Sequence, residues 1–246
     1  MIRLLWAAAF AWVVLAPFGP VAADTHKRPA VEDIVRLFET VVFGSEYDPK
    51  LASTVIVKWQ SPVRLAIKGK PGERHLEFLG KHAATLSGLT GLPIELAKPG
   101  EAANVTVAFV PRAQMSKIQI LDEPQKMAER QKMIERLAAP GGCYFISWQK
   151  GGLIVGGVIV VNTERDMARI NHCLLEELTQ TLGFPNDTDI LRPSIFSDND
   201  HLHALSRPDE IVLRTLYDPR LKPGMPKAEA LKIAPTIIRE LNARLP

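Results

Sequence analysis

The chain has 246 residues, of which 46% are hydrophobic, and its 30 Lys and Arg only slightly outnumber its 27 Asp and Glu, for a formal charge of +3. A nearly balanced charge, with no basic stripe carrying interleaved aromatic residues, argues against nucleic-acid binding. The sequence also contains no Gly-rich phosphate loop, no nucleotide fingerprint and no G-x-S-x-G motif, which argues against the enzymes that depend on them. The length suits one large domain or one domain with extensions.

The first 23 residues have the three parts of a cleavable secretory signal peptide. Arg3 supplies a positive charge, Leu4 to Ala16 are uninterruptedly apolar, and Val21-Ala22-Ala23 offers small residues for cleavage before Asp24. The apolar stretch, about 13 residues long, is shorter than the roughly 20 residues that span a bilayer, so a membrane anchor is the less favoured alternative. We therefore expect a periplasmic or secreted protein that does not span a membrane once the signal is cleaved.

Hydrophobic periodicity predicts the order of the elements that follow. Helices are expected over residues 31–43, 73–89, 122–138, 207–216 and 228–241, and strands over 55–59, 63–67, 94–96, 105–110, 143–148 and 153–161. A further helix, capped near Asn162 and Asp166, has a predicted buried stripe of Met167, Ile170, Leu174, Leu175, Leu178 and Leu182. Gly183, followed by Phe184 and Pro185, predicts a left-handed cap and a firm end to that helix.

The two cysteines of the chain are Cys143 and Cys173. In an oxidising compartment they are expected to form one disulfide. Closing a loop of about 30 residues would stabilise the fold by roughly 3–4 kcal/mol on the chain-entropy model. The alternative is a pair of free thiols that act as metal ligands or as a nucleophile.

One segment has the spacing of a metallopeptidase signature. Glu176-Glu177-x-x-Gln180-x-x-Gly183-x-x-Asn186 is spaced as the H-E-x-x-H-x-x-G-x-x-H motif of metzincin peptidases. In that motif, residues four apart on a helix meet one metal, the residue after the first ligand is the general base, and the Gly turns the chain to deliver a third ligand. The segment therefore resembles a metzincin site in its spacing.

More closely, the chain resembles an exported proteobacterial family, the domain of unknown function family numbered 2927. The resemblance lies in the run from Cys173 to Gln180, in Ser194-Ile195-Phe196 and in the run from Leu216 to Leu221. This family carries no established activity. Together the two resemblances imply an α+β, zincin-like (matrixin-like) fold: a mixed sheet with a long helix packed on it, a central motif helix and C-terminal helices. They imply a helical extension over 24–54, a zincin-like domain over 55–225 and a C-terminal helix over 226–246.

The ligand positions depart from the metzincin pattern. They hold Glu176, Gln180 and Asn186 in place of three histidines, and the methionine expected near Phe196 is absent. Zinc prefers imidazole and thiolate ligands, so the chain is not expected to be a standard zinc peptidase. Only Glu177, at the general-base position, keeps the residue of the signature.

Three interpretations of this segment remain open. In the favoured one, its polar groups hold helix to sheet, no cofactor is expected, and the domain is a non-enzymatic module that binds an envelope protein or peptide. In the second, an oxygen-only site binds calcium, magnesium or manganese through Glu176, Gln180, Asn186, Asp187 and Asp189. In the third, Glu177 is the general base of a divergent peptidase or amidase, metal-dependent or not. His172, His201 and His203 are expected at the surface.

Overall fold

A mixed five-stranded sheet lies at the centre of the computed structural model, which describes residues 28–98, 100–118 and 127–245. The strands are β1 (Val63–Gly69), β2 (Ile94–Leu96), β3 (Val105–Val110), β4 (Cys143–Lys150) and β5 (Leu153–Asn162). In the order β2-β1-β3-β5-β4, all neighbours are parallel except β4, which pairs antiparallel with β5 at one edge. The expected α+β class with a mixed sheet is therefore confirmed.

Strand β5 is buried on both faces of the sheet. Successive side chains of a strand point to opposite faces, so Ile159 and Val161 join one hydrophobic cluster while Val158 and Val160 join another. The nearly continuous apolar run of this strand is typical of a strand that helices cover on both sides. Here that cover comes from two unequal helical layers.

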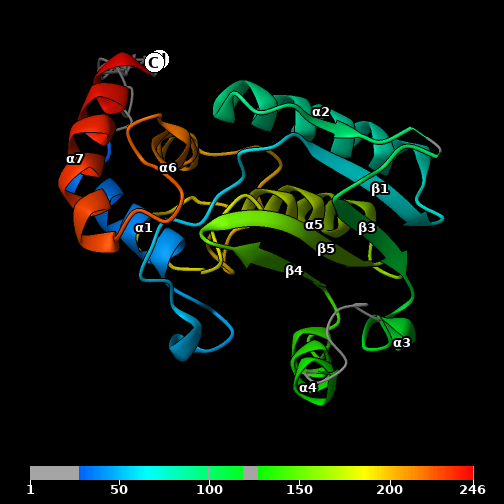
Figure 1. Cartoon of the computed structure of the whole chain (residues 1–246). Helices are drawn as coiled ribbons and strands as arrows, with labels where there is room; N and C mark the ends of the chain where they lie inside the picture. The colour runs from blue at the N-terminus through cyan, green and yellow to red at the C-terminus, as the bar shows by residue number, and fades with distance from the viewer. Residues whose placement is uncertain (1–27, 99, 119–126, 246) are drawn as a thin grey trace, which may run out of the picture.

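The larger layer contains α1 (Val31–Phe43), α2 (Glu73–Thr90), α5 (Met167–Gln180), α6 (Arg207–Tyr217) and α7 (Lys227–Arg244). Helices α2 and α5 pack against each other, and α5 also packs on β4 and β5, while α1, α6 and α7 form a group beside them (Figure 1). Hydrogen bonds join the start of α1 to the end of α7: Arg28 donates to the Asn242 carbonyl at 3.2 Å, and Asn242 donates to the Pro29 carbonyl at 3.2 Å. These helices share one hydrophobic core.

The smaller layer contains α3 (Arg112–Met115) and α4 (Met127–Ala138) on the other face of the sheet. Met115, Ile134 and Tyr144 belong to its hydrophobic cluster, and the Tyr144 hydroxyl donates to the Met115 carbonyl at 2.7 Å. A 3-10 turn, η1 (Pro49–Leu51), follows α1.

The predicted strand over residues 55–59 is wrong. This segment forms only isolated bridges at Val55 and Lys58. Its side chains bind elsewhere: the Lys58 ammonium donates to the Leu216 carbonyl at 2.8 Å and the Trp59 indole donates to the Thr181 carbonyl at 3.0 Å. The segment is thus held by the ends of two helices, so its apolar run does not indicate a sheet strand.

Other differences are smaller. Helix α3 was not expected, and α5 begins at an Asp166 cap, so Met167 is 44% exposed and outside the buried stripe. The predicted signal peptide, and the first part of the helix predicted over 122–138, lie outside the described residues. Among the described residues, no helix has the length and apolar character needed to cross a membrane.

Candidate functional site

Helix α5 carries the residues that the sequence singles out, and it is fixed to the sheet at its middle. Its cap is Asp166, whose carboxylate accepts from the Arg169 amide at 2.9 Å. Cys173 lies on its buried face and is bonded to Cys143 at the start of β4. The predicted disulfide is therefore confirmed, and it ties the motif helix to the edge strand.

The end of α5 is held by residues from distant parts of the chain. The indole of Trp59 bonds the carbonyl of Thr181, and the Tyr217 hydroxyl donates to the Leu182 carbonyl at 2.8 Å. Gly183 follows with a φ of +117°, and a Cβ there would lie 2.3 Å from the Val57 carbonyl oxygen. The chain can turn here only because the residue is glycine, and the turn brings the next residues back toward α5.

Three carboxylates from separate segments meet beside this turn. Oxygens of Glu176 on α5, Asp187 after the turn and Asp198 in the following loop all lie within 4.8 Å of one another. Glu46, from the loop after α1, joins them through a hydrogen bond with Asp187, and its amide donates to the Pro185 carbonyl at 3.2 Å. We call Glu46, Glu176, Asp187 and Asp198 the acidic cluster.

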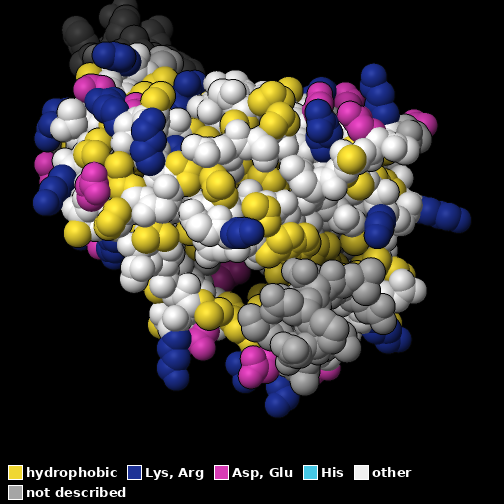
Figure 2. All heavy atoms as spheres, in the orientation of Figure 1, with side chains coloured by type: hydrophobic (Ala, Val, Ile, Leu, Met, Phe, Trp, Pro, Cys, Tyr) yellow, Lys and Arg dark blue, Asp and Glu magenta, His cyan; other side chains and the backbone are white. Residues whose placement is uncertain are grey.

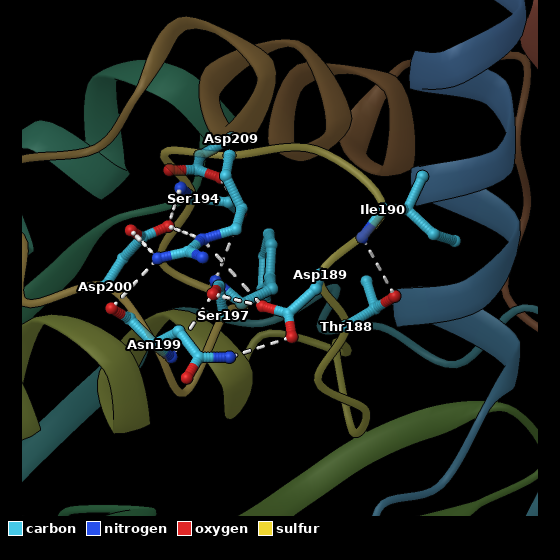
Figure 3. Close-up of polar contacts among 10 residues, drawn as sticks. Thr188, Asp189, Ile190, Ser194, Ser197, Asn199, Asp200 and Asp209 are labelled. Atoms are coloured by element: carbon cyan, nitrogen blue, oxygen red, sulfur yellow. Dashed lines mark hydrogen bonds and ion pairs between the residues drawn. The ribbon is translucent and has the colours of Figure 1, made fainter.

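A polar network within one loop positions Asp198 (Figure 3). Both of its neighbours bond to the same carboxylate: the Ser197 hydroxyl donates to Asp189 at 2.6 Å and the Asn199 amide donates to it at 2.8 Å. Asp200 in turn accepts from Arg192 at 2.8 Å. Because these neighbours are already partnered, Asp198 is the member of its loop that reaches the acidic cluster.

Burial and repulsion by neighbouring carboxylates raise the pKa values of Glu176 and Asp187. Burial first, and then the negative charges of Asp198 and Glu46, raise the pKa of Glu176 to about 8. Burial, the hydrogen bond with Glu46 and the neighbouring charges raise the pKa of Asp187 as well. The cluster therefore favours bound protons, or another source of positive charge, at neutral pH.

Glu177 faces the same region from a more buried position. The residue is 5% exposed and lines the pocket described next, yet its side chain forms no hydrogen bond or ion pair with any residue in the described ranges. Burial, followed by repulsion from Glu176, raises its pKa well above the usual range. A buried carboxyl without a partner is costly to keep, so a ligand or water in the pocket is the expected partner.

The pocket has a volume of about 520 Å³, and both the acidic cluster and the disulfide line it. Figure 2 shows a hollow on one face of the molecule with an acidic side chain inside it. At the rim, the His172 ring lies 5.3 Å from the ring of His201, and its Nε2 is 3.6 Å from a Glu176 oxygen. Arg165 also lines the pocket, half-buried and without a hydrogen bond or ion pair among the residues that the structure describes.

The structure brings together only part of the predicted site. Glu176, Glu177, Gln180 and Asp187 all line the pocket, and the Gln180 amide donates to Asp187 at 2.6 Å. Asn186 does not line it: its amide donates to the Asp187 backbone carbonyl at 2.7 Å.

Asp189 does not join the cluster either, because its carboxylate accepts hydrogen bonds from Ser197 and Asn199 of its own loop. Sequence reasoning missed two carboxylates: Asp198 joins Glu176 and Asp187, and Glu46 bonds to Asp187. Asp198 sits in a run of polar residues that could have drawn attention, but no local pattern marks Glu46, because it comes from the far end of the chain. His201 and His203 are exposed, as expected, and His201 also lines the pocket, whereas His172 is half-buried in the pocket wall.

A protein-family model described as "Protein of unknown function (DUF2927)" matches residues 31–236. The match spans both helical layers, the sheet and the whole acidic cluster. No curated protein and no solved structure gave a significant match.

Proposed function

Because the chain belongs to the family of proteins of unknown function DUF2927, which assigns no activity, we propose a function from the pocket itself: the domain binds a divalent cation. Its ligands are Glu176, Asp187 and Asp198, and the cation is of the oxygen-preferring class, calcium, magnesium or manganese. The main support is the convergence of three carboxylates from three segments, with oxygens within 4.8 Å of one another.

The charge balance of the cluster favours a cation. Among the described residues, none of the three carboxylates is paired with a Lys or Arg, and the His172 ring is the only basic group within ion-pair distance, 3.6 Å from Glu176. Carboxylates held close together repel one another unless protons or a cation neutralise them. The pocket leaves room for waters to complete the coordination that these cations prefer. Gln180 supports the site by holding Asp187 in place.

We place this module in the cell envelope or outside the cell. The predicted signal peptide supports export, and so does the Cys143–Cys173 disulfide, since such bonds persist mainly in oxidising compartments. The pocket would then bind an envelope protein or peptide in a cation-dependent way. A relation to the zincin fold stays a proposal, supported by the metzincin spacing of α5 and by the antiparallel strand β4 at the edge of the sheet.

Calorimetric titration of the purified chain, first stripped with a chelator, tests cation binding. We expect one calcium, magnesium or manganese ion per chain, and a loss of affinity of at least tenfold in Glu176→Gln and in Asp198→Asn. Glu95→Gln is the matched control, because Glu95 is an exposed carboxylate on β2 at the other edge of the sheet. Absence of binding, or equal affinity in all the variants, would contradict the proposal.

A second function, hydrolysis, is favoured by one observation: Glu177 is buried and unpartnered beside the acidic cluster, within the described ranges. In its ionised form a carboxylate at this position can take a proton from an attacking water and return it to a leaving amine. A peptidase and amidase screen with Glu177→Gln tests this function. Lost activity at an unchanged melting temperature supports catalysis, whereas lost folding indicates a structural role.

A further inference from the structure

The disulfide and the two glutamates of α5 lie on one patch of the pocket wall. The sulfur of Cys143 lies within 4.8 Å of carboxylate oxygens of both Glu176 and Glu177. Cys173, bonded to Cys143, precedes these glutamates by three and four residues on α5. Residues at those spacings share one face of a helix. One sulfur and two carboxylates therefore meet where α5 faces β4, and the second sulfur is bonded to the first.

We propose that reduction of the Cys143–Cys173 disulfide converts this patch into a zinc site, with two thiolates and the carboxylates of Glu176 and Glu177 as ligands. This site shares only Glu176 with the cation site proposed above and does not depend on it. It also differs from that site in ligand chemistry, because two of its four ligands are thiolates.

The electron and proton balance is simple. A phosphine or dithiol reductant gives two electrons to the S–S bond, and each sulfur takes up one proton to become a thiol. When zinc binds, both thiols release their protons to solvent, since the thiolate is the ligand. In the oxidised protein the sulfur lone pairs are poor ligands, whereas thiolates select zinc over calcium and magnesium.

The distances suit a tetrahedral ion. Zinc–sulfur bonds of about 2.3 Å and zinc–oxygen bonds of about 2.0–2.2 Å place the ligand atoms roughly 3.3–3.8 Å apart. The Cys143 sulfur and the two carboxylates already lie within 4.8 Å of one another, so side-chain rotations of modest size close the site. Glu177 has no competing partner in the described ranges, and the pocket of about 520 Å³ gives the ion a route in.

In this arrangement, the cation that the chain prefers depends on whether the two cysteines are thiols or a disulfide. Before the disulfide forms, the chain binds zinc at this patch, and zinc competes with oxidation because it occupies both sulfurs. After oxidation, only the oxygen ligands of the acidic cluster remain.

Zinc affinity of the full chain, measured by competition with a chromogenic chelator, tests the proposal. The oxidised protein is compared with protein treated with a phosphine. The phosphine takes the oxygen of one water molecule to become its oxide, and the two protons of that water convert both sulfurs to thiols. We expect one zinc per reduced chain, bound at least a hundredfold more tightly than by the oxidised chain. Cobalt in place of zinc should give the near-ultraviolet charge-transfer absorption of a thiolate complex.

Variants separate this site from the acidic cluster. Cys143→Ser should cost at least a hundredfold in zinc affinity of the reduced chain, and Glu177→Gln about tenfold. Asp198→Asn should weaken calcium or manganese binding by the oxidised chain. The matched control is Glu95→Gln, which changes an exposed carboxylate on β2 at the other edge of the sheet and should leave zinc binding by the reduced chain unchanged.

Three results would overturn the proposal. One is equal zinc affinity before and after reduction, and another is equal affinity in a reduced Glu176→Gln, Glu177→Gln double variant. The third applies if the reduced chain unfolds, which circular dichroism detects. Zinc should then restore the native spectrum, and a chain that binds zinc without refolding would contradict the site.

Discussion

At the scale of single residues, the acidic cluster makes the stability of the cation-free protein depend on pH. The pKa of Glu176 is raised to about 8, and those of Glu177 and Asp187 are raised too. Between the ordinary carboxyl pKa and these raised values, the folded protein binds more protons than the unfolded chain. Folding stability is therefore fully present at acidic pH and declines as the pH rises.

We accordingly predict that the cation-free protein loses stability between about pH 5 and pH 8, by up to roughly 1.4 kcal/mol per pH unit for each proton retained only by the folded state. Urea unfolding at a series of pH values measures this. Glu176→Gln should flatten the profile, and saturating calcium or manganese should raise the stability most at the alkaline end. A stability that rises steadily from pH 5 to 8 would contradict the protonated state of the cluster.

Asp209 illustrates a buried carboxylate that is structural. It accepts hydrogen bonds from the Ser194 hydroxyl at 2.7 Å, the Ile195 amide at 3.1 Å and the Ser206 amide at 2.8 Å, and Figure 3 shows it beside Ser194. Asp209→Ala leaves these buried donors unpaired, so we predict a loss of roughly 3 kcal/mol or more in the free energy of unfolding.

Asp166→Ala is the comparison for that measurement. It removes an exposed helix cap and an exposed ion pair with Arg169 and should cost about 1 kcal/mol. Equal losses for the two variants in urea denaturation would mean that the buried network around Asp209 contributes little.

At the scale of elements, the turn after α5 determines whether the acidic cluster forms. Gly183 has a φ of +117°, and a Cβ there would meet the Val57 carbonyl oxygen at 2.3 Å. We predict that Gly183→Ala destabilises the fold by roughly 2–4 kcal/mol, because strained backbone and a steric clash combine. Cation affinity should fall as well, since Asp187 follows this turn.

The control is Gly88→Ala in the exposed part of α2, where an added Cβ has nothing within 4 Å. That change should stabilise the protein by about 0.5–1 kcal/mol, because alanine is the better helix former. Thermal melting of both variants gives the comparison. If Gly183→Ala melted like the unmodified protein, the turn would not be the constraint that we describe.

The disulfide holds the same helix at Cys173, before the turn, by bonding it to β4. With a sequence separation of 30 between Cys143 and Cys173, the chain-entropy model gives roughly 3–4 kcal/mol of stabilisation. A Cys143→Ala, Cys173→Ala double variant should lose about that much in guanidinium unfolding. Reduction of the unmodified protein in a strong chelator should lower its stability by a similar amount, and a much smaller effect would indicate residual structure in the unfolded chain.

At the scale of the whole molecule, local patterns predicted most helices and strands, and they failed where distant parts of the chain meet. The strand predicted over 55–59 is absent because Lys58 and Trp59 bind the ends of α6 and α5. Periodicity cannot reveal such a connection, because an apolar run looks the same in either setting.

In the candidate site, too, residues close in sequence were predictable and a distant one was not. Glu176, Glu177, Gln180 and Asp187 were found because they lie within one helix and its turn. Glu46 was not, because only the folding of α1 against the segment around Pro185 brings it to the pocket. The disulfide was predictable from composition and from the expectation of export, since two cysteines allow one pairing.

The bonds from residues 28 and 29 to Asn242 have a consequence for chain connectivity. Because both ends of the folded body already touch, their order along the polypeptide should be dispensable. A short glycine linker could join them, and new ends could be opened in the exposed turn around Lys70, between β1 and α2. Such a circular permutant should fold and keep the cation affinity of the unmodified protein, which would show that packing, not chain order, builds this pocket.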